Sequence, residues 1–544
     1  MSYDRQMRRR SSLLLLPLTL AVLPLLGGAC STFGADPEHA GPTPDADAST
    51  SPDGTDPVKG APDRGLTITV GEPKATAFVI QNGALDLPVK LTRRESTTGA
   101  VVVTVTNLPP DVTAEPLTIP TGKTEGTLTL RAKATSIQGG PKIADIKAVE
   151  EGALGSGAST TLPTFVRGGH GALDTTFGDK GTLIQLYGMG SEADAFDAKT
   201  LKDGSILVGA RARTNLVLSR FSPSGALDSS FPGGGTLLVI PSQGFAAFDV
   251  IEPPSPATGW IYFLQGNGSS SPLIVRLNLD GTRDTKFNGN GQTVLADPGA
   301  GAVLVPQQVF ALPDGRALVS HQRAGAATTV VSRWNPDGTR DESYGTSGVC
   351  AIAGYGRMLL RSAGAVFMIG NKGMQGCTPN GLLDQTIGIA PNYAAKAGGA
   401  EAVDIARTPS GGVAFLNVKS NQNVLNRLTP ALDKDASIGT LGDVFTPLSQ
   451  SASNLSNTLL VQEDGGVLIG TPAIGDAQRD TVSVLRYTSK GVLDTTFGTA
   501  GTATFTISGG AQLTKLVAQP DGRILALGKS DQTGFDAAML RFWP

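Results

Sequence analysis

The chain has 544 residues, enough for several domains, and a composition typical of a folded, β-rich protein, with 70 glycines, 40% hydrophobic and 17% charged residues. The formal net charge of -3 gives no electrostatic reason to expect nucleic acid or an anionic membrane surface as a partner, and we expect no nucleic-acid binding. Aromatic residues make up only 5%, which weighs against stacked-sugar platforms and aromatic cages.

Residues 1–30 have the pattern of a bacterial lipoprotein export signal. A run of arginines is followed by an apolar core at 13–26, which two prolines interrupt and which is too short for a comfortable membrane span. The core ends in Leu-Gly-Gly-Ala before Cys30, and this resembles the lipobox, in which that cysteine is lipidated and becomes the new N-terminus. The alternative is an ordinary cleaved signal with an incidental cysteine.

Residues 31–65 are rich in proline, aspartate, serine and glycine, and almost none of them could enter a hydrophobic core. Such a segment is expected to stay extended and disordered. Behind a lipidated Cys30 it would hold the folded part away from the bilayer. We therefore expect an extracytoplasmic protein, anchored by lipid to the bacterial membrane, at the outer membrane or cell surface.

Residues 66–167 change to alternating apolar and polar residues, as in Leu66, Ile68 and Val70, with turn signals between about seven short runs. This pattern predicts an antiparallel β-sandwich. The stretch 103–113, with the Gly-bounded Leu-Thr-Leu run that follows it, resembles bacterial immunoglobulin-like stalk domains. The resemblance implies a spacer.

From about residue 168 onward the chain repeats one unit. The stretches 171–181 and 491–501 share Leu-Asp-Thr-Thr-Phe-Gly, and degraded copies lie between them. The motif aspartates recur at a spacing in the range of propeller repeats. They are Asp174, Asp228, Asp284, Asp341, Asp384, Asp433 and Asp494.

Each unit also carries a Gly-containing turn, often Asp-Gly, between two apolar runs, which is a strong hairpin signal because glycine accepts positive φ without a Cβ penalty. A strand ending in arginine follows in most units. With the Leu-Asp-x-x-Phe-Gly turn, these features resemble the delta-60 repeat family of predicted β-propellers of bacterial surface proteins. The resemblance covers 168–544 and implies an all-β fold with a seven-bladed β-propeller after the immunoglobulin-like sandwich.

Several of these arginines precede a motif aspartate by eight positions, and we predict that each guanidinium binds the carboxylate of the following turn. The alternative is that the aspartates only cap turns and the arginines are solvated. In the remaining units Arg427 precedes Asp433 by six, and Gly376 stands where the fourth unit would have its arginine. Asp174 and Arg541 are left over, and closing the ring would pair them, with the strand near 182–186 completing the last blade. The predicted pairs are Arg220–Asp228, Arg276–Asp284, Arg333–Asp341, Arg486–Asp494 and Arg541–Asp174.

Cys350 and Cys377 are the cysteines that remain besides Cys30. A disulfide between them is allowed in an oxidising compartment, and two buried free thiols are the alternative. No oxygen-rich calcium loop, phosphate loop or nucleophile elbow is present, so we predict no metal, no cofactor and no catalytic residue. His321 has no suggestive neighbours in the sequence and is expected to be a surface or satisfied histidine.

Two functions from different classes fit these observations. The first is a monomeric, non-catalytic, lipid-anchored protein whose propeller binds another surface macromolecule. The second is an extracytoplasmic hydrolase or lyase with a site at one mouth of the propeller channel. Few histidines, few aromatics and no clustered carboxylates favour the first. A purely architectural coat protein is a third alternative.

Overall fold

The computed structural model describes residues 66–544 apart from several internal gaps. The signal at 1–30 with Cys30, and the linker at 31–65, lie outside the described residues. The gaps are 72–75, 94–96, 153–156, 188–192, 213–214, 242–243, 255–257, 267–271, 298–303, 324, 326, 362–363, 388–401, 420–421, 441, 450–456, 473–480, 508–510 and 531–535.

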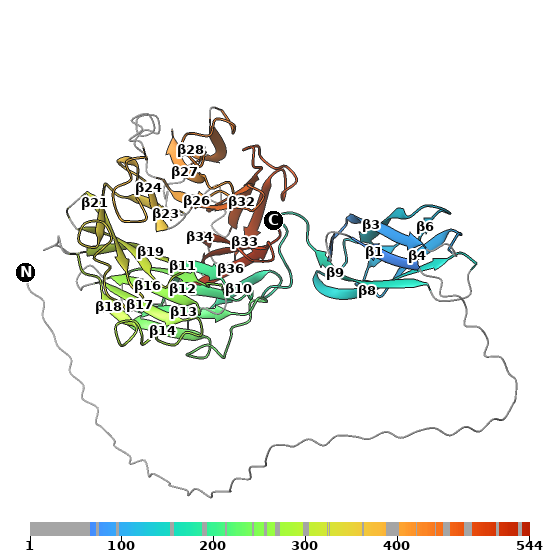
Figure 1. The fold of residues 1–544 in the computed structure, drawn as a ribbon, viewed down its shortest axis with the longest axis horizontal. Helices are drawn as coiled ribbons and strands as arrows, with labels where there is room; N and C mark the ends of the chain where they lie inside the picture. The colour runs from blue at the N-terminus through green and yellow to red at the C-terminus, as the bar shows by residue number, and fades with distance from the viewer. Residues whose placement is uncertain are drawn as a thin grey trace, which may run out of the picture. The chain divides into compact units, whose positions relative to one another are not determined.

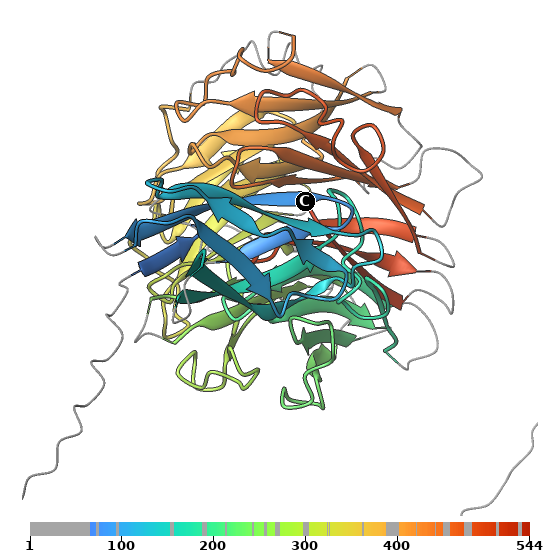
Figure 2. The ribbon, with the colours of Figure 1, turned by 90° about the vertical axis from the view of Figure 1, so that its right-hand side faces the viewer.

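The first nine strands form two sheets, with orders β1-β3-β7-β5 and β2-β9-β8-β4-β6 (Figure 2, blue to teal). All pairings are antiparallel except the parallel pair of β2 and β9. The strands are β1 (Leu66–Val70), β2 (Ala77–Ile80), β3 (Ala84–Arg93), β4 (Val101–Thr106), β5 (Val112–Ala114), β6 (Leu117–Ile119), β7 (Glu125–Ala132), β8 (Gly139–Glu150) and β9 (Ala158–Arg167).

The alternating pattern of the sequence decides which side of each sheet is buried. In β3, Leu87, Val89 and Leu91 are buried while the residues between them are exposed, because side chains alternate across a strand. Residues of both sheets contribute to one hydrophobic cluster, which includes Val79 and Leu130. The sequence predicts about seven strands here, and the described residues form nine, because β5 and β6 are three-residue strands too short to give a periodic signal.

The remaining strands form sheets that we name I to VII (Figure 1). Sheet I is β11 (Ala193–Thr200), β12 (Ile206–Ala212), β13 (Asn215–Phe221) and β14 (Thr236–Pro241). Sheet II is β15 (Phe245–Ile251), β16 (Trp260–Gly266), β17 (Leu273–Asn278) and β18 (Gln292–Val294). Sheet III is β19 (Leu304–Ala311), β20 (Ala317–Arg323), β21 (Thr328–Trp334) and β22 (Val349–Ala353).

Sheet IV has three strands in the described part of the chain: β23 (Gly356–Leu360), β24 (Val366–Gly370) and β25 (Gly373–Cys377). Sheet V is β26 (Asp404–Arg407), β27 (Val413–Lys419), β28 (Gln422–Leu428) and β29 (Asp443–Ser449). Sheet VI is β30 (Thr458–Val461), β31 (Val467–Pro472), β32 (Thr481–Tyr487) and β33 (Thr502–Thr506). Sheet VII is β34 (Ala511–Ala518), β35 (Ile524–Ser530), β36 (Asp536–Phe542) and β10 (Thr182–Gln185).

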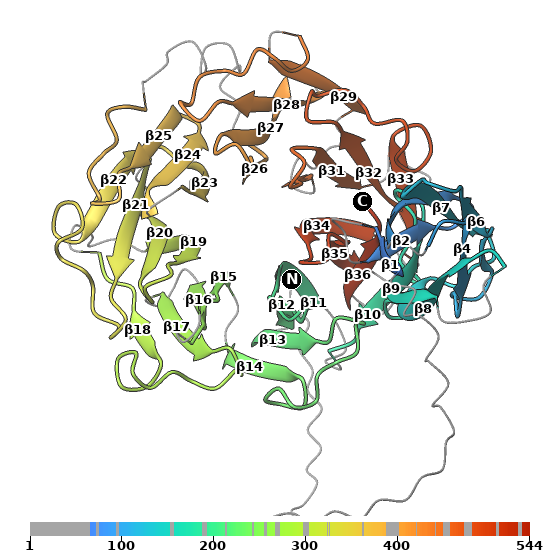
Figure 3. The same cartoon turned by 45° about the vertical axis from the view of Figure 1, so that its right-hand side comes forward.

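These sheets follow one another around a ring, each with its strands running in the order given from the inside of the ring to the outside (Figure 3). The second strand is buried on both faces, as in β12, where six of seven residues are buried. Such a strand needs apolar residues on both sides, which explains the uninterrupted run Ile-Leu-Val-Gly-Ala after the Asp-Gly turn.

Sheet VII combines two distant parts of the chain. β10 pairs antiparallel with β36, and Thr182 faces Leu540 across the pair. Ring closure explains this arrangement, because the outermost strand comes from the beginning of the repeats and the other three strands come from their end. Every element with bounds in the described residues is a strand, and none of the described segments is a helix long and apolar enough to cross a membrane.

Candidate functional site

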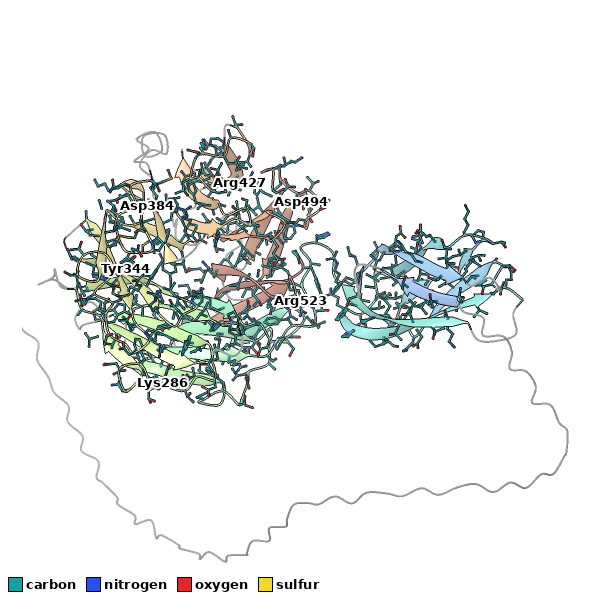
Figure 4. The ribbon with its side chains drawn as sticks, in the orientation of Figure 1. Lys286, Tyr344, Asp384, Arg427, Asp494 and Arg523 are labelled. Carbon is teal, nitrogen blue, oxygen red and sulfur yellow. A yellow bond between two sulfur atoms is a disulfide. The ribbon has the colours of Figure 1, made fainter. Side chains whose placement is uncertain are left out.

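The repeated turn places each of the paired arginines of the sequence analysis beside its aspartate. The closest nitrogen–oxygen distances are Arg220 Nε–Asp228 Oδ2 3.4 Å, Arg276 Nη2–Asp284 Oδ2 2.7 Å, Arg333 Nε–Asp341 Oδ2 2.7 Å, Arg486 Nη1–Asp494 Oδ2 3.4 Å and Arg541 Nε–Asp174 Oδ2 2.7 Å. Figure 4 labels residues of the motif turns (Tyr344, Asp384 and Asp494), with Arg427 of β28 and Arg523 of the hairpin between β34 and β35.

The backbone explains the spacing of eight. The N–H of the motif aspartate donates to the carbonyl of the arginine, as from Asp228 to Arg220 at 2.9 Å, so the same two residues meet through backbone and side chain. The second carboxylate oxygen accepts from the residue two positions on, as from the Ser230 hydroxyl at 2.6 Å. This local bond mimics a backbone turn. The aspartate therefore fixes both the start and the direction of the turn.

Burial makes the pairs unequal in energetic weight. Arg276 and Arg541 are 2% and 1% exposed, whereas the Arg220 side chain is 22% exposed. Around Asp174, burial alone would raise the carboxyl pKa, but hydrogen bonds from Thr176 and the charge of Arg541 hold this pKa below its ordinary value. A buried pair costs most when one partner is removed, because the other charge is left without compensation.

The turn also contacts the next sheet. Three residues after the motif aspartate stands a buried apolar side chain, and in four of the turns the N–H that follows it donates to a turn carbonyl of the next sheet. Gly178 donates in this way to Ser224 at 2.9 Å and Gly345 to Asn380 at 2.7 Å. A Cβ placed on Gly225 would lie 2.7 Å from the Phe177 ring, so glycine is needed where the two turns touch. The motif thus joins neighbouring sheets.

In sheet V the predicted motif aspartate was wrong. Arg427 Nε lies 2.6 Å from Asp435 Oδ2, eight residues on, and Asp433 is not its partner. The Leu-Asp dipeptide at 432–433 imitates the motif two residues too early, because Leu432 occupies the position that is glycine in the other turns. Its φ of 67° is the left-handed conformation that glycine normally provides. The constant spacing from the arginine is the signal that identifies Asp435.

The exchange at Leu432 has a counterpart in the preceding turn. Ile387 of sheet IV stands where most other turns have phenylalanine or tyrosine, and it shares a hydrophobic cluster with Leu432. In three other turns a large ring faces a glycine, as Tyr344 faces Gly381 with 2.7 Å to a Cβ placed there. Here a smaller side chain faces a leucine. The two departures from the repeat therefore compensate each other in volume.

The innermost strands carry a second set of contacts, which we call the inner belt. At each seam between neighbouring sheets, a side chain of one innermost strand bonds the next strand or the residue beside it. In order, the contacts are Thr200 Oγ1 to Ala518 O (2.9 Å), Lys199 Nζ to Asp249 Oδ1 (3.2 Å), Ala311 N to Asp249 Oδ2 (3.0 Å), Gln308 Nε2 to Met358 O (3.3 Å), Arg357 Nε to Val403 O (3.0 Å), Leu459 N to Asp404 Oδ2 (2.9 Å) and Leu516 N to Thr458 Oγ1 (3.3 Å).

Lys199 shows how firmly the inner belt holds its charges. Its ammonium lies 3.5 Å from Asp197 and 3.2 Å from Asp249. Burial alone would lower the pKa of Lys199, but the charges of both carboxylates raise it above its ordinary value. The lysine therefore stays protonated and serves as a bridge between sheets I and II rather than as a base.

His321 has partners that its neighbours in the sequence do not reveal. It is fully buried in β20, and its Nε2 lies 3.1 Å from Asp297 Oδ2. Arg323 binds the same carboxylate through two nitrogens, at 2.5 and 2.8 Å. Because the carboxylate only accepts, Nε2 carries the proton, and Nδ1 is buried with no hydrogen-bond partner among the described residues. Asp297 lies 24 residues from His321 along the chain, so no local sequence pattern predicts the His321–Asp297–Arg323 cluster.

The remaining candidate residues are structural in their surroundings. Cys350 and Cys377 form a disulfide bond between β22 and β25. Among the residues that the structure describes, no group of three histidine, cysteine or acidic side chains is placed to hold a metal ion. The candidate site is therefore a set of contacts between neighbouring sheets, located at the motif turns and on the innermost strands.

The compensation between Ile387 and Leu432 predicts strong coupling. Ile387→Phe overfills the contact and Leu432→Gly empties it, so each single variant should lose about 1–3 kcal/mol of unfolding free energy. The double variant restores the ring-on-glycine contact of the other turns and should lose at least about 1 kcal/mol less than the sum. Urea unfolding of the four proteins measures this, and additive losses would contradict the assignment.

The environment of His321 predicts a pH dependence of stability. Burial lowers its pKa below the ordinary 6.5, with Asp297 opposing and Arg323 assisting. The unfolded chain then binds more protons than the folded chain, so stability should fall as pH decreases from about 6.5 towards the folded-state pKa. His321→Asn should flatten this part of the profile. Unfolding free energies of both proteins across this pH range test the expectation, and parallel profiles would refute it.

Comparison with known proteins supports a β-propeller scaffold. A family model described as a domain of unknown function (DUF5122) beta-propeller matches residues 201–231 and 258–287. Each matched stretch includes the second and third strands of a sheet and the turn with its motif aspartate, in sheets I and II. No curated protein matches the chain.

Among solved structures, the chain is similar to prolyl oligopeptidase B from Galerina marginata, apo protein, at 7% identity, with 72% of this chain and 54% of that chain covered and a TM-score of 0.36. It is also similar to a DUF4784 family protein from Bacteroides caccae, at 10% identity, covering 80% and 98%, with a TM-score of 0.22. The chain spans about half the length of the peptidase. At these TM-scores neither similarity bears on activity. The described fold is all-β, and its ring of repeated sheets is a β-propeller scaffold similar to the DUF5122 repeats.

Proposed function

We propose that this protein is a lipid-anchored surface protein whose seven-bladed β-propeller is a non-catalytic scaffold for binding another macromolecule. The observation that carries the proposal is a difference between the two ends of the sheets. At one end most repeats keep the lengths of their connections, and at the other end they do not.

The constant end holds the hairpins between first and second strands and the motif turns between third and fourth strands. Salt bridges join the two, as Arg220 binds both Asp203 of a hairpin and Asp228 of a turn. The hairpin at 252–259 is longer than the others. The other six hairpins have five residues each: 201–205, 312–316, 361–365, 408–412, 462–466 and 519–523. The turns differ by at most one residue in length: 222–235, 279–291, 335–348, 429–442 and 488–501. The stretch that follows sheet IV lies partly outside the described residues.

The variable end holds the hairpins between second and third strands and the crossovers to the next sheet. These hairpins range from two to eight residues: 213–214, 267–272, 324–327, 371–372, 420–421, 473–480 and 531–535. The crossovers of two to nine residues include 186–192, 242–244, 295–303, 354–355, 450–457 and 507–510. Repeats of one origin have thus diverged in length mainly at this end.

This asymmetry is typical of a recognition scaffold. A framework with fixed hydrogen bonds positions connections that tolerate changes in length, and recognition residues concentrate on such connections. The inner belt connects the sheets to one another, and Arg–Asp pairs hold the motif turns of every sheet but sheet IV in place. We therefore assign the binding surface to the variable end. The partner is a surface macromolecule, and the proposal needs neither a cofactor nor nucleic acid.

Sheets I to VII would be the seven blades, in agreement with the resemblance to the delta-60 repeat. The two sheets of β1 to β9 would be an immunoglobulin-like spacer. The linker at 31–65 and a lipidated Cys30 would complete a tether that presents a monomeric propeller outside the bacterial membrane. Together these parts would place a binding face at a distance from the bilayer.

The anchor predicts a covalent lipid on Cys30. Growth of the expressing bacterium with a clickable fatty acid should label the full-length protein and leave the Cys30→Ser variant unlabelled. The variant should also move from the detergent phase to the aqueous phase in a phase-separation assay, because it loses its acyl chains. Labelling of both proteins, or of neither, would count against the anchor.

The binding face can be located by cross-linking. Exposed Lys372 lies in a hairpin of the variable end, and exposed Lys490 lies in a motif turn of the constant end. With intact cells as the source of partner, amine cross-links to foreign peptides should form at Lys372 and not at Lys490. Lys372→Glu should weaken partner recovery severalfold and Lys490→Glu should not. Cross-links confined to Lys490, or no specific partner, would reject the proposal.

A further inference from the structure

Sheet IV lacks the Arg–Asp pair that the other sheets use. The described residues give it three strands, and Gly376 replaces the arginine at the end of its third strand. The turn itself is preserved, since the Asp384 N–H donates to the Gly376 carbonyl at 2.9 Å and the Asp384 carboxylate accepts from Thr386. The aspartate is present, but among the described residues no guanidinium binds this carboxylate as in the other turns.

The sequence after Asp384 also departs from the repeat. Seven residues after the motif aspartate, the other six turns have a glycine with positive φ, at Gly181, Gly235, Gly291, Gly348, Gly442 and Gly501. Gly181 also donates its N–H to the Phe177 carbonyl at 2.8 Å. In the turn after sheet IV the residue at this position is Pro391, which lies outside the described residues. Proline holds φ at a negative value and has no N–H, so the sequence departs from the repeat at this position.

A different set of contacts joins sheet IV to sheet III. The Cys350–Cys377 disulfide connects β22 to β25, and both cysteines are buried, at 3% and 0% exposure. Beside it, the Gln375 amide pairs with the backbone of Ala353 in both directions, at 2.8 and 3.2 Å. The Tyr355 N–H donates to Asn371 at 3.0 Å.

We infer that the Cys350–Cys377 disulfide is a redox-sensitive covalent link across the seam between sheets III and IV, formed by a sheet that lacks an Arg–Asp pair of its own. The disulfide sits between the outer strand of sheet III and the third strand of sheet IV, and the adjacent Gln375–Ala353 pair aligns the two edges. The cluster around it contains Leu318, Val331 and Met368, from both sheets. Reduction leaves the hydrogen bonds of the seam in place and removes this covalent link, so the seam should open more often.

Reduction of this bond is a two-electron exchange. A dithiol attacks one sulfur and the Sγ–Sγ bond breaks. The two cysteines become thiols by taking up the two protons that the dithiol gives up, and the dithiol becomes a cyclic disulfide. Because both sulfurs are buried, a reagent reaches them only when the seam opens. The rate of reduction under native conditions therefore reports how often this seam opens.

Amide hydrogen exchange of the full-length protein with and without a reducing dithiol tests the inference. Peptide mapping under non-reducing conditions first establishes that Cys350 is linked to Cys377. After reduction, exchange in β22 and β25 should rise on the order of tenfold or more. The strands of sheet I, whose seams carry no cysteine, should be unchanged. The double variant Cys350→Ala/Cys377→Ala should reproduce the reduced pattern without reagent.

Gln375→Ala is the matched control, because it removes the neighbouring amide pair and leaves the disulfide. It should change exchange little in the oxidised protein and add to the increase in the reduced protein. Unchanged exchange in β22 and β25 after reduction, or an equal rise in all sheets, would overturn the inference. If the double variant does not fold, the reduced native protein still separates these outcomes.

Discussion

The ring depends on its seams, and each seam is held by a polar contact between adjacent inner strands. Opening any one seam exposes a face of each of two sheets to solvent, so every seam must be held. The inner belt solves this with different chemistry at each place: a hydroxyl at Thr200, an ammonium at Lys199 and a carboxylate at Asp404. What the seams share is that a side chain bonds the neighbouring inner strand or the residue beside it. Buried polar groups are thereby satisfied, which limits the desolvation cost of a polar centre.

The repeated turns perform the corresponding task at the constant end. The backbone N–H of each motif aspartate donates to the preceding strand, and its carboxylate accepts from the residue two positions on. In every sheet but sheet IV a guanidinium binds the same carboxylate, and the apolar residue three positions on packs against the following turn. This concentration of roles explains why Leu-Asp-x-x-Phe-Gly is the best preserved pattern in the chain. Near Asp384, where the arginine is missing, isoleucine (Ile387) also replaces the aromatic residue that most other turns have.

The sequence predicts much of this fold because its signals are local. The Asp-Gly turns mark the hairpins, and the spacing of eight links Arg333 to Asp341 from the residue order alone. Sequence reasoning fails where a local pattern misleads, as at Asp433, and where partners are distant, as for His321 and Asp297. The inner belt is also not predictable from the sequence, because its residue types differ from seam to seam and form no recurring pattern. Cys30 and the linker lie outside the described residues and stay predictions.

The pairing of β10 with β36 has a consequence for the order in which the ring is made. A ribosome releases Thr182–Gln185 long before Asp536–Phe542, so the earliest strand of the ring waits for the latest one. During that interval the exposed backbone of β10 could pair wrongly with other nascent strands. Elongation at about 5–20 residues per second makes the wait roughly tens of seconds. The molecule therefore stays an open arc until β36 has been made, and termination before β36 leaves an arc instead of a smaller ring.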